Sequence, residues 1–225
     1  MKIVAFSDTH GHHREVSLPD GDVLVFAGDL MTCGRKFNEV VSFADWFMGQ
    51  PHKHKILVAG NHDRLFETQR PMCVGEFSNR GYVNYLQDSG CEIDGVKFWG
   101  SPYQPWFYDW AFNVYRGPEI KKHWDKIPEG TDVLITHGPA MGHLDQSVPK
   151  GLVSSWSSTF IVPATEHVGC EELDIAVQVI RPKVHIFGHI HGSYGVEETP
   201  NTNFHNVAIC DEQYNPVNQP HQIYL

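Results

Sequence analysis

Five short apolar runs along the chain are each followed closely by Asp, Asn or His. The runs are four or five residues long, rich in β-branched residues and bounded by Gly or turn residues, which is typical of buried strands. They cover residues 2–6, 23–26, 55–58, 132–135 and 184–187. The polar motifs that follow them are Asp8-Thr9-His10, Gly28-Asp29, Gly60-Asn61-His62-Asp63, Thr136-His137-Gly138 and Gly188-His189-Ile190-His191. Because open α/β sheets form their sites at the carboxyl ends of strands, these side chains are expected to meet there.

Two other stretches have apolar residues at helical spacing. One covers residues 37–48, and the other covers 173–180 before Arg181-Pro182 ends it. The alternation of strand, helix and strand in the first half predicts a parallel core. Residues 95–99 and 204–209 have the pattern of strands added antiparallel to that core.

Length and composition predict a single domain over residues 1–225. The chain is 41% hydrophobic, enough for a substantial core, and no Pro/Gly/Ser-rich linker divides it. The apolar run before Asp8 is too short for the core of a signal peptide, and no apolar run approaches about 18 residues. The five Cys are scattered without a Cys-x-x-Cys pair and are interpreted as reduced thiols. We therefore expect a cytoplasmic protein with no membrane association.

The formal net charge of −10 argues against a long nucleic acid as the partner. Non-specific binding to nucleic acid needs Lys and Arg to neutralise several phosphates. Bound dications would offset part of the negative charge locally. A small anionic ester therefore fits better than duplex DNA.

The residue types of the five motifs predict the chemistry of the site. Carboxylates, imidazoles and one carboxamide form a mixed nitrogen and oxygen ligand set that suits manganese, iron, zinc or magnesium. The absence of Cys from the set argues against a structural zinc site. Two such ions held about 3.5 to 4 Å apart can clamp a phosphate ester and lower the pKa of a bound water to about 7. The implied reaction is hydrolysis of a phosphate ester.

The order and composition of the motifs resemble the calcineurin-like metallophosphoesterases. Their sequence blocks are Asp-x-His, Gly-Asp, Gly-Asn-His-Asp/Glu, a single His and Gly-His-x-His. A closer resemblance is to the small phosphodiesterases of the metallophosphoesterase-domain-containing (MPPED) type. It extends over nearly the whole chain, through 18–22, 85–89, 105–107, 127–132, 148–150 and 168–170. The stretch 151–160 departs from it, because it is longer than the family's connection.

The resemblance implies a fold and a set of roles. The fold is an α/β four-layer sandwich of two mixed sheets, packed face to face and flanked by helices. It implies two divalent ions, most simply Mn²⁺, with Fe, Zn, Mg or Ni as alternatives, and a bridging hydroxide as the nucleophile. The metal ligands are Asp8, His10 and His191 for one ion, Asn61, His137 and His189 for the other, and Asp29 for both. His62 is the general acid that protonates the leaving alkoxide, and Asp63 orients its imidazole.

The candidates for substrate contact are two basic residues and one aromatic residue. Arg64 and Lys150 are the basic residues of the motif loops, and either ammonium or guanidinium could meet a phosphate. Trp106 belongs to an aromatic run over residues 103–110 that suits stacking on a nucleobase, although such clusters more often cover a sheet. The stretch from Gly151 to His167 has no role that the sequence indicates.

Three functions remain open from the sequence. The first is a phosphodiesterase for small diesters of the cyclic nucleotide type, with a nucleotide as the small-molecule partner. The second is a phosphomonoesterase, either a nucleotidase or a protein phosphatase. The protein phosphatase branch is disfavoured because Leu30-Met31-Thr32 stands where that group has Asp-Arg-Gly. The third is a non-catalytic binding module, which is disfavoured because every ligand position is kept.

Overall fold

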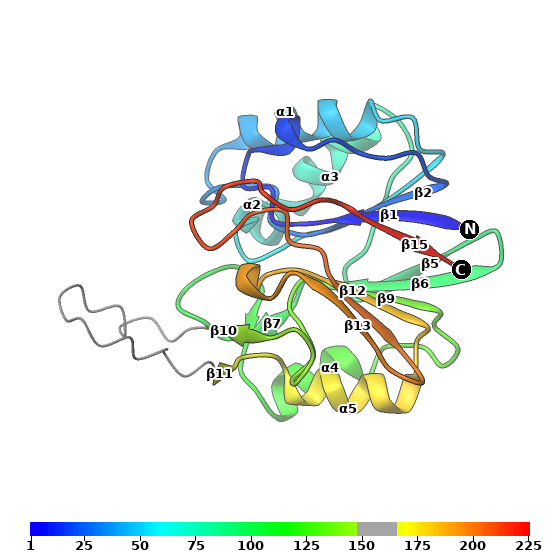
Figure 1. The fold of residues 1–225 in the computed structure, drawn as a ribbon. Helices are drawn as coiled ribbons and strands as arrows, with labels where there is room; N and C mark the ends of the chain where they lie inside the picture. The colour runs from blue at the N-terminus through cyan, green and yellow to red at the C-terminus, as the bar shows by residue number, and fades with distance from the viewer. Residues whose placement is uncertain (148–165) are drawn as a thin grey trace, which may run out of the picture.

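Two mixed sheets lie face to face in the computed structural model, with helices on both outer faces (Figure 1). The structure describes residues 1–147 and 166–225. The expected four-layer sandwich of two mixed sheets and flanking helices is confirmed.

The first sheet has the strand order β15-β1-β2-β3-β4. Its strands are β1 (Lys2–Phe6), β2 (Val23–Ala27), β3 (His54–Val58), β4 (Asn84–Tyr85) and β15 (His221–Tyr224). Strands β1 to β4 are parallel, and β15 pairs antiparallel with β1. The helices on this side are α1 (Phe37–Met48), α2 (Arg64–Thr68) and α3 (Arg70–Ser78), with the short 3₁₀ helix η1 (His13–Glu15). The parallel core and the helix over residues 37–48 are both as predicted.

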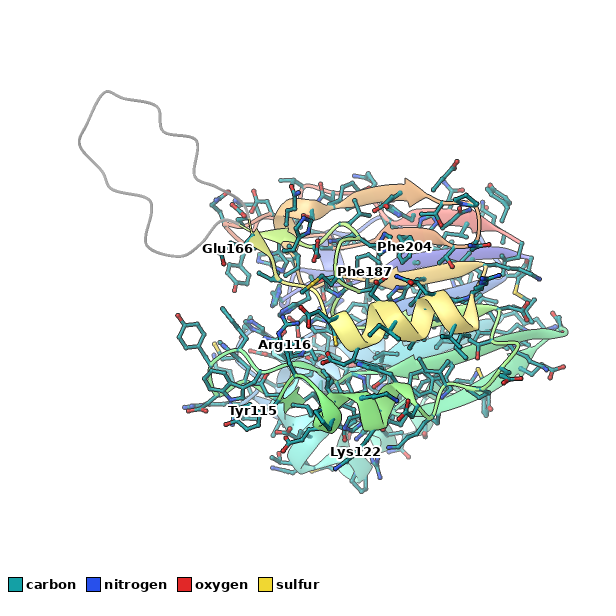
Figure 2. All side chains as sticks on the ribbon, turned by 90° about the horizontal axis from the view of Figure 1, so that it is seen from below. Tyr115, Arg116, Lys122, Glu166, Phe187 and Phe204 are labelled. Carbon is teal, nitrogen blue, oxygen red and sulfur yellow. The ribbon has the colours of Figure 1, made fainter. Side chains whose placement is uncertain are left out.

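The second sheet has the order β13-β14-β12-β9-β6-β5. Its strands are β5 (Ser89–Ile93), β6 (Val96–Ser101), β9 (Val133–Thr136), β12 (Val184–Phe187), β13 (Gly195–Glu198) and β14 (Asn203–Asn206). The 3₁₀ helix η2 (His191–Ser193) joins β12 to β13, and α4 (Pro118–Trp124) and α5 (Glu171–Ile180) cover the outer face. Viewed from below, Phe187 and Phe204 lie beside α5 (Figure 2). The helix predicted over 173–180 is α5.

The strands predicted over 95–99 and 204–209 as antiparallel additions pair antiparallel with one neighbour only, and the second strand ends earlier than expected. Strand β14 ends at Asn206 and pairs parallel with β12, while β13 pairs antiparallel with it on the other side. Strand β6 likewise pairs antiparallel with β5 and parallel with β9. An alternating pattern shows which residues face the core, but it does not say which neighbours the strand will have.

Two small strand pairs lie outside the main sheets. One is the parallel pair of β7 (Gln104–Pro105) and β8 (Asn113–Val114), which closes the aromatic loop between them. The other is the antiparallel pair of β10 (Gln146–Ser147) and β11 (Glu166–His167).

The apolar strands read as continuous runs because both of their faces are buried. In β1, Val4 and Phe6 pack toward α1 and α3, whereas Ile3 and Ala5 pack against the second sheet. A third apolar cluster lies between the second sheet and the helices α4 and α5. The carboxyl ends of β1, β2 and β3 lie at the same end of the molecule as those of β9 and β12. As a result, the candidate ligands from both sheets meet there.

None of the helices in residues 1–147 and 166–225 combines the length and the apolar character that crossing a bilayer requires.

Candidate metal centre

The seven predicted metal ligands converge on one place between the ends of the two sheets. Two groups of side chains have ligand atoms within 4.8 Å of one another and divide as the sequence suggested: Asp8, His10 and His191 in one, and Asp29, His137 and His189 in the other. Asn61 joins the second group, because its Oδ1 lies 2.8 Å from His137 Nε2 and 2.9 Å from His189 Nδ1. The structure therefore brings all seven residues together.

Asp29 lies between the two groups. Its Oδ2 is 3.8 Å from His10 Nε2 on one side and 3.3 Å from His137 Nε2 on the other. Its Oδ1 accepts a hydrogen bond of 2.7 Å from the backbone N–H of His62. One carboxylate oxygen is thus fixed to the backbone, and the other faces both sets of imidazoles, as a bridging ligand requires.

Three of the histidines are oriented by backbone carbonyls. The Nδ1–H groups of His10, His137 and His191 donate to the carbonyl oxygens of Met31, Ala27 and Asp211, at 3.2, 3.0 and 2.9 Å. Each bond fixes the tautomer of a neutral ring and leaves the lone pair of Nε2 pointing inward. Hydrogen bonds of this kind to the remote nitrogen are the usual support of a metal-binding histidine.

The inward nitrogens face other electron-rich atoms. His10 Nε2 and His191 Nε2 are 3.3 Å apart, and both approach the Asp8 carboxylate. His137 Nε2 faces Asn61 Oδ1 and Asp29 Oδ2. Lone pairs that meet at such distances need a proton or a cation between them. The donor set therefore fits two divalent cations, with nitrogen and oxygen ligands from buried side chains.

Burial and mutual charge set the protonation of these groups. Burial lowers the pKa of His10 to about 4 and of His189 to about 3, so both rings are neutral at pH 7. Burial raises the pKa of Asp8, but the hydrogen bond and charge of His191 outweigh it and bring the pKa down to about 2. Burial also lowers the pKa of His137, yet the adjacent Asp29 carboxylate raises it to about 9. Metals bind neutral imidazoles and ionised carboxylates, so a cation beside Asp29 would displace the proton that His137 holds without it.

Several ligands have a left-handed backbone. Asp8, His10, Asp29 and His189 have φ values of 54°, 42°, 63° and 69°. This region is uncommon for residues other than Gly and costs of order 1–3 kcal/mol at each position. The surrounding hydrogen bonds hold these conformations: Asp8 N–H donates to Gly28 O at 2.8 Å, and His189 N–H donates to the Asp8 carboxylate at 3.1 Å.

The glycines of the motifs have a packing reason. A Cβ at Gly60 would overlap the Asp29 carboxylate and the His137 ring, and a Cβ at Gly188 would overlap the Asp8 carboxylate. Gly28 has a φ of 104°, and a Cβ there would overlap His137 Nδ1. Each of these glycines therefore lets its own loop approach the neighbouring candidate ligand closely, because no side chain stands between them.

His62 lies at the edge of the first ligand group. A nitrogen of its ring lies within 4.8 Å of a ring nitrogen of His10 and of a carboxylate oxygen of Asp29. The ring stacks on Trp110 with a centroid distance of 4.1 Å and an interplanar angle of 20°. The Nδ1–H group donates to the carbonyl oxygen of Thr32 at 2.5 Å. Its Nε2 is left as the nitrogen that can exchange a proton with a bound molecule.

The role expected for Asp63 needs correction. Its carboxylate does not orient the His62 ring, because Thr32 O holds Nδ1 of that ring. Asp63 is buried and accepts hydrogen bonds from the backbone N–H groups of Asp29, Met31 and Gly60, at 2.9, 3.0 and 2.8 Å. Burial, followed by the charge of Asp29, raises the pKa of Asp63 to about 7. Asp63 thus joins the loops after β2 and β3, which carry the candidate bridging ligand and the candidate acid.

Two of the residues expected to contact substrate, Arg64 and Trp106, have partners in the structure other than the candidate ligands. The Arg64 guanidinium donates to the carbonyl oxygen of Asp109, in the loop between β7 and β8. Trp106 is exposed and stacks on Tyr115, with ring centroids 6.3 Å apart. Lys150 and most of the stretch from Gly151 to His167 lie outside the described residues.

Two other aromatic residues lie against the site. Trp110 was part of the aromatic run but was not singled out, and it is the residue of that run that stacks on His62. Tyr214 was missed altogether. Its ring meets those of His10 and His191 edge to face, with centroids 4.8 and 5.3 Å away. Tyr214 belongs to a polar stretch near the end of the chain, in which no apolar pattern marks it.

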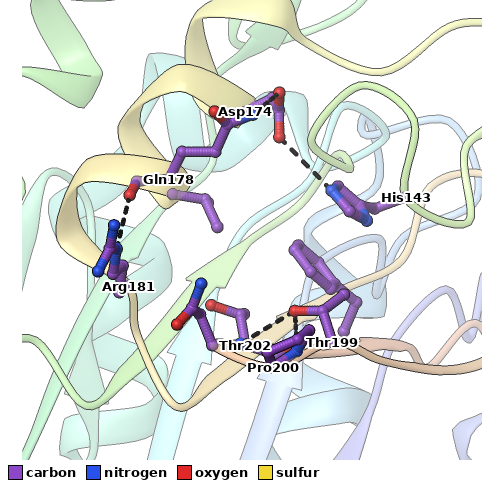
Figure 3. A pocket seen from close by; sticks show the side chains of 10 residues that line it. His143, Asp174, Gln178, Arg181, Thr199, Pro200 and Thr202 are labelled. Carbon is purple, nitrogen blue, oxygen red and sulfur yellow. Dashed lines mark hydrogen bonds and ion pairs between the residues drawn. The ribbon is translucent and has the colours of Figure 1, made fainter.

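A separate cavity of about 390 Å³ opens beside α5 (Figure 3). The His143 ring stacks on Phe204 there, with centroids 3.7 Å apart and an interplanar angle of 4°, and bonds Glu197. The other polar side chains that line the cavity are Asp174, Gln178, Arg181, Thr199, Asn201 and Thr202. The candidate metal ligands are not among its lining residues, so this cavity and the metal centre are distinct places.

Comparison with known families and structures agrees with this geometry. A sequence model of the family described as calcineurin-like phosphoesterase matches residues 1–193. The chain belongs to this family. The match includes every residue of the five motifs and ends before the loop that carries Tyr214.

Animal proteins are among the sequences that are similar to this chain. Human metallophosphoesterase domain-containing protein 1 is 38% identical over 240 residues, which cover 97% of this chain and 69% of the human protein. The protein UPF0046 protein K07C11.7 of Caenorhabditis elegans is 35% identical over 236 residues, covering 100% of this chain and 75% of its own length. The resemblance to the MPPED type is thereby confirmed.

A solved structure shares the fold at low sequence identity. The crystal structure of phosphopantetheinyl hydrolase (PptH) from Mycobacterium tuberculosis superposes with a TM-score of 0.60, at 14% identity, over 99% of this chain and 95% of that chain. At this identity the likeness concerns the fold alone.

Proposed function

We propose that this calcineurin-like phosphoesterase is a binuclear metal-dependent hydrolase of small phosphodiesters. The observation that carries the proposal is the position of Asp29 Oδ2 between two sets of inward-facing imidazole nitrogens. Asp8, His10 and His191 hold one ion, Asn61, His137 and His189 hold the other, and Asp29 is shared. The nitrogen and oxygen donors favour Mn²⁺, with Fe, Zn, Mg or Ni as alternatives. When bound, the two ions supply an activated water and neutralise charge on the phosphate.

The protein residues orient the substrate and move a proton. His62 donates from Nε2 to the leaving oxygen, while the hydrogen bond from Nδ1–H to Thr32 O holds the ring in place. Trp110 covers one face of the ring and limits its rotation. Asp63 fixes the backbone on either side of this arrangement through the hydrogen bonds that it accepts from backbone N–H groups of both loops.

The electrostatics of the ligand cluster support a diester as substrate. In the described part of the chain, the hydrogen bonds and ion pairs made by the seven ligand side chains involve no Lys or Arg, and Arg64 is directed to Asp109 O. A monoester dianion carries more charge than a diester monoanion and would gain from extra cations. A nucleoside cyclic phosphate is the diester class that we propose, following the resemblance described from the sequence.

A panel of substrates tests the proposal. The protein loaded with Mn²⁺ should show a higher kcat/KM for an aryl diester and a nucleoside cyclic phosphate than for the matching monoesters. Elemental analysis should find two ions per chain. A preference for the monoester with every metal tried would replace this proposal by a nucleotidase function, and turnover without metal would exclude the metal mechanism.

The Asp29→Asn variant gives the matched control. A carboxamide offers one coordinating oxygen without the negative charge that two cations share, so the ions should bind less tightly and activity should be lost. Turnover close to the wild-type rate with both ions bound would contradict the bridging role of Asp29.

A further inference from the structure

The loop after β14 places one aromatic ring over the metal centre. Tyr214 meets His10 and His191 edge to face, with interplanar angles of 80° and 82°, and lies 6.1 Å from the His62 ring. It remains 45% exposed. One part of the phenol ring therefore packs on candidate ligands, and the rest is open to a molecule bound beside them.

A compact turn fixes this ring. The Asp211 carboxylate accepts hydrogen bonds from the backbone N–H groups of Gln213 and Asn215, at 2.9 and 2.8 Å. Its carbonyl accepts from the N–H of Tyr214 at 2.9 Å and also from His191 Nδ1 at 2.9 Å. Tyr214 itself has a left-handed backbone with φ of 64°. The turn thus links the position of Tyr214 to that of the candidate ligand His191. Because the ring is already held in place, little conformational entropy is lost when a ligand binds against it.

Tyr214 lies beside the region where a substrate must lie. Tyr214 contacts residues of the first ligand group and approaches His62. If a phosphate lay between the two ligand groups and within reach of His62, its organic substituent would therefore lie next to the Tyr214 ring. Trp110 occupies the stacking face of His62 and is unavailable there. Trp106 stacks on Tyr115 instead.

We propose that Tyr214 is a specificity-determining residue, whose ring binds the organic substituent of the phosphate ester and favours planar aromatic groups or nucleosides. This inference rests on the proposed function. It names a residue outside the part of the chain that the family model matches. Aromatic contacts of this kind add affinity without added charge, so they fit a site that distinguishes esters by their substituent.

Binding of two product analogues tests the inference directly. Calorimetry at pH 8 on the Mn²⁺-loaded protein compares inorganic phosphate, which has no substituent, with phenyl phosphate, which carries a ring at a similar charge. The wild type should bind phenyl phosphate more tightly. Tyr214→Ala should lose about three- to tenfold in affinity for phenyl phosphate and keep its affinity for inorganic phosphate. Tyr214→Phe should behave as the wild type, because the ring and not the hydroxyl makes the contact.

Controls separate this role from simple support of the histidines. Metal content measured on each variant should stay at the wild-type value, and Tyr224→Ala, which removes an exposed tyrosine from β15, should change neither affinity. Equal weakening of phosphate and phenyl phosphate in Tyr214→Ala, or loss of metal, would overturn the inference and make Tyr214 a support for His10 and His191. Loss of the preference in Trp106→Ala, with the preference kept in Tyr214→Ala, would also overturn it.

The proposed function can fail independently. If monoesters prove the better substrates while Tyr214→Ala still loses the preference for phenyl phosphate, the diester assignment falls and the role of Tyr214 stands.

Discussion

The hydrogen-bond partners of the candidate ligands His10, His137 and His191 differ from those of His185, and the difference marks which rings are available for chemistry. His10, His137 and His191 each give Nδ1–H to a backbone carbonyl and turn Nε2 toward other acceptors. His185 is buried like His10 and His137, but its Nε2 bonds the hydroxyl of Thr136, inside the second sheet. The partner of the second nitrogen, rather than burial itself, distinguishes a candidate ligand from a packing residue.

The candidate ligands could be picked out from the sequence because each is a side chain of suitable type that follows a predicted strand. Their orienting partners could not, because Met31, Ala27 and Asp211 act through carbonyl oxygens that every residue has. The same reason explains the correction at His62, where a carbonyl takes the place expected for the Asp63 carboxylate.

Removal of His62 should affect substrates according to their leaving group. Loss of a general acid typically costs about 10² to 10⁴ in rate, and the loss shrinks where the leaving group needs no proton. His62→Asn should therefore slow an alkyl diester far more than a nitrophenyl diester, with both ions still bound. Steady-state kinetics and metal analysis check this. Equal losses on both substrates would assign His62 a structural role.

Asp63→Ala should destabilise the fold itself. It leaves the N–H groups of Asp29, Met31 and Gly60 without their partner, and each buried unpaired donor costs roughly 1–3 kcal/mol. We expect the free energy of unfolding to fall by about 3 kcal/mol or more in urea titrations with chelator present. Asp20→Ala, at an exposed carboxylate, is the control and should change little. An unchanged unfolding midpoint in Asp63→Ala would show that water replaces the carboxylate.

At the scale of elements, the five strand-end turns decide the site. The strands themselves were predictable, because runs buried on both faces leave a continuous apolar signal. The neighbours of β14 could not be predicted, because strand pairing depends on distant segments. The short pair of β7 and β8 could not be predicted either, because two-residue strands carry no periodicity. The aromatic loop between β7 and β8 therefore could be noticed but not placed.

A pair of glycine substitutions isolates the geometry of one turn. Gly60→Ala puts a Cβ into the Asp29 carboxylate and the His137 ring, so metal affinity and activity should drop. Gly75→Ala, inside α3, meets nothing within 4 Å and should raise stability by about 0.5–1 kcal/mol. Thermal melts and metal titrations of both variants give the comparison. Unimpaired metal binding in Gly60→Ala would mean that the turn can open without losing the ligand positions.

At the scale of the whole molecule, buried neutral histidines make stability depend on pH. Burial lowers the pKa values of His13, His205 and His221 to about 4. Between pH 6.5 and 4 the unfolded chain binds protons that the folded chain does not, so the free energy of unfolding falls as pH decreases through this window. Asp63, with its raised pKa, acts in the opposite direction below pH 7.

The pair His205 and His221 offers the clearest test, because it joins β14 of one sheet to β15 of the other, with the Nδ1 atoms 3.1 Å apart. Urea unfolding at pH 7.5 and 5.5, with chelator present, should show a smaller pH dependence for His221→Gln than for the wild type. The contribution of Asp63 is common to both proteins and cancels. Identical pH dependence would mean that these two histidines take up protons without loss of stability.

The distribution of the proposed ligands gives the ions a mechanical part as well. Asp8, His10, Asp29 and Asn61 follow strands of the first sheet, whereas His137, His189 and His191 follow strands of the second. Bound ions would therefore cross-link the two sheets at one end, while apolar side chains and polar contacts such as His205 with His221 join them elsewhere. A pulling force applied at the opposite end, for example through Asp20 and Gly95, would separate the sheets there first, because the ions hold them together at the metal centre. Rupture under load would then require a higher force with Mn²⁺ than with chelator.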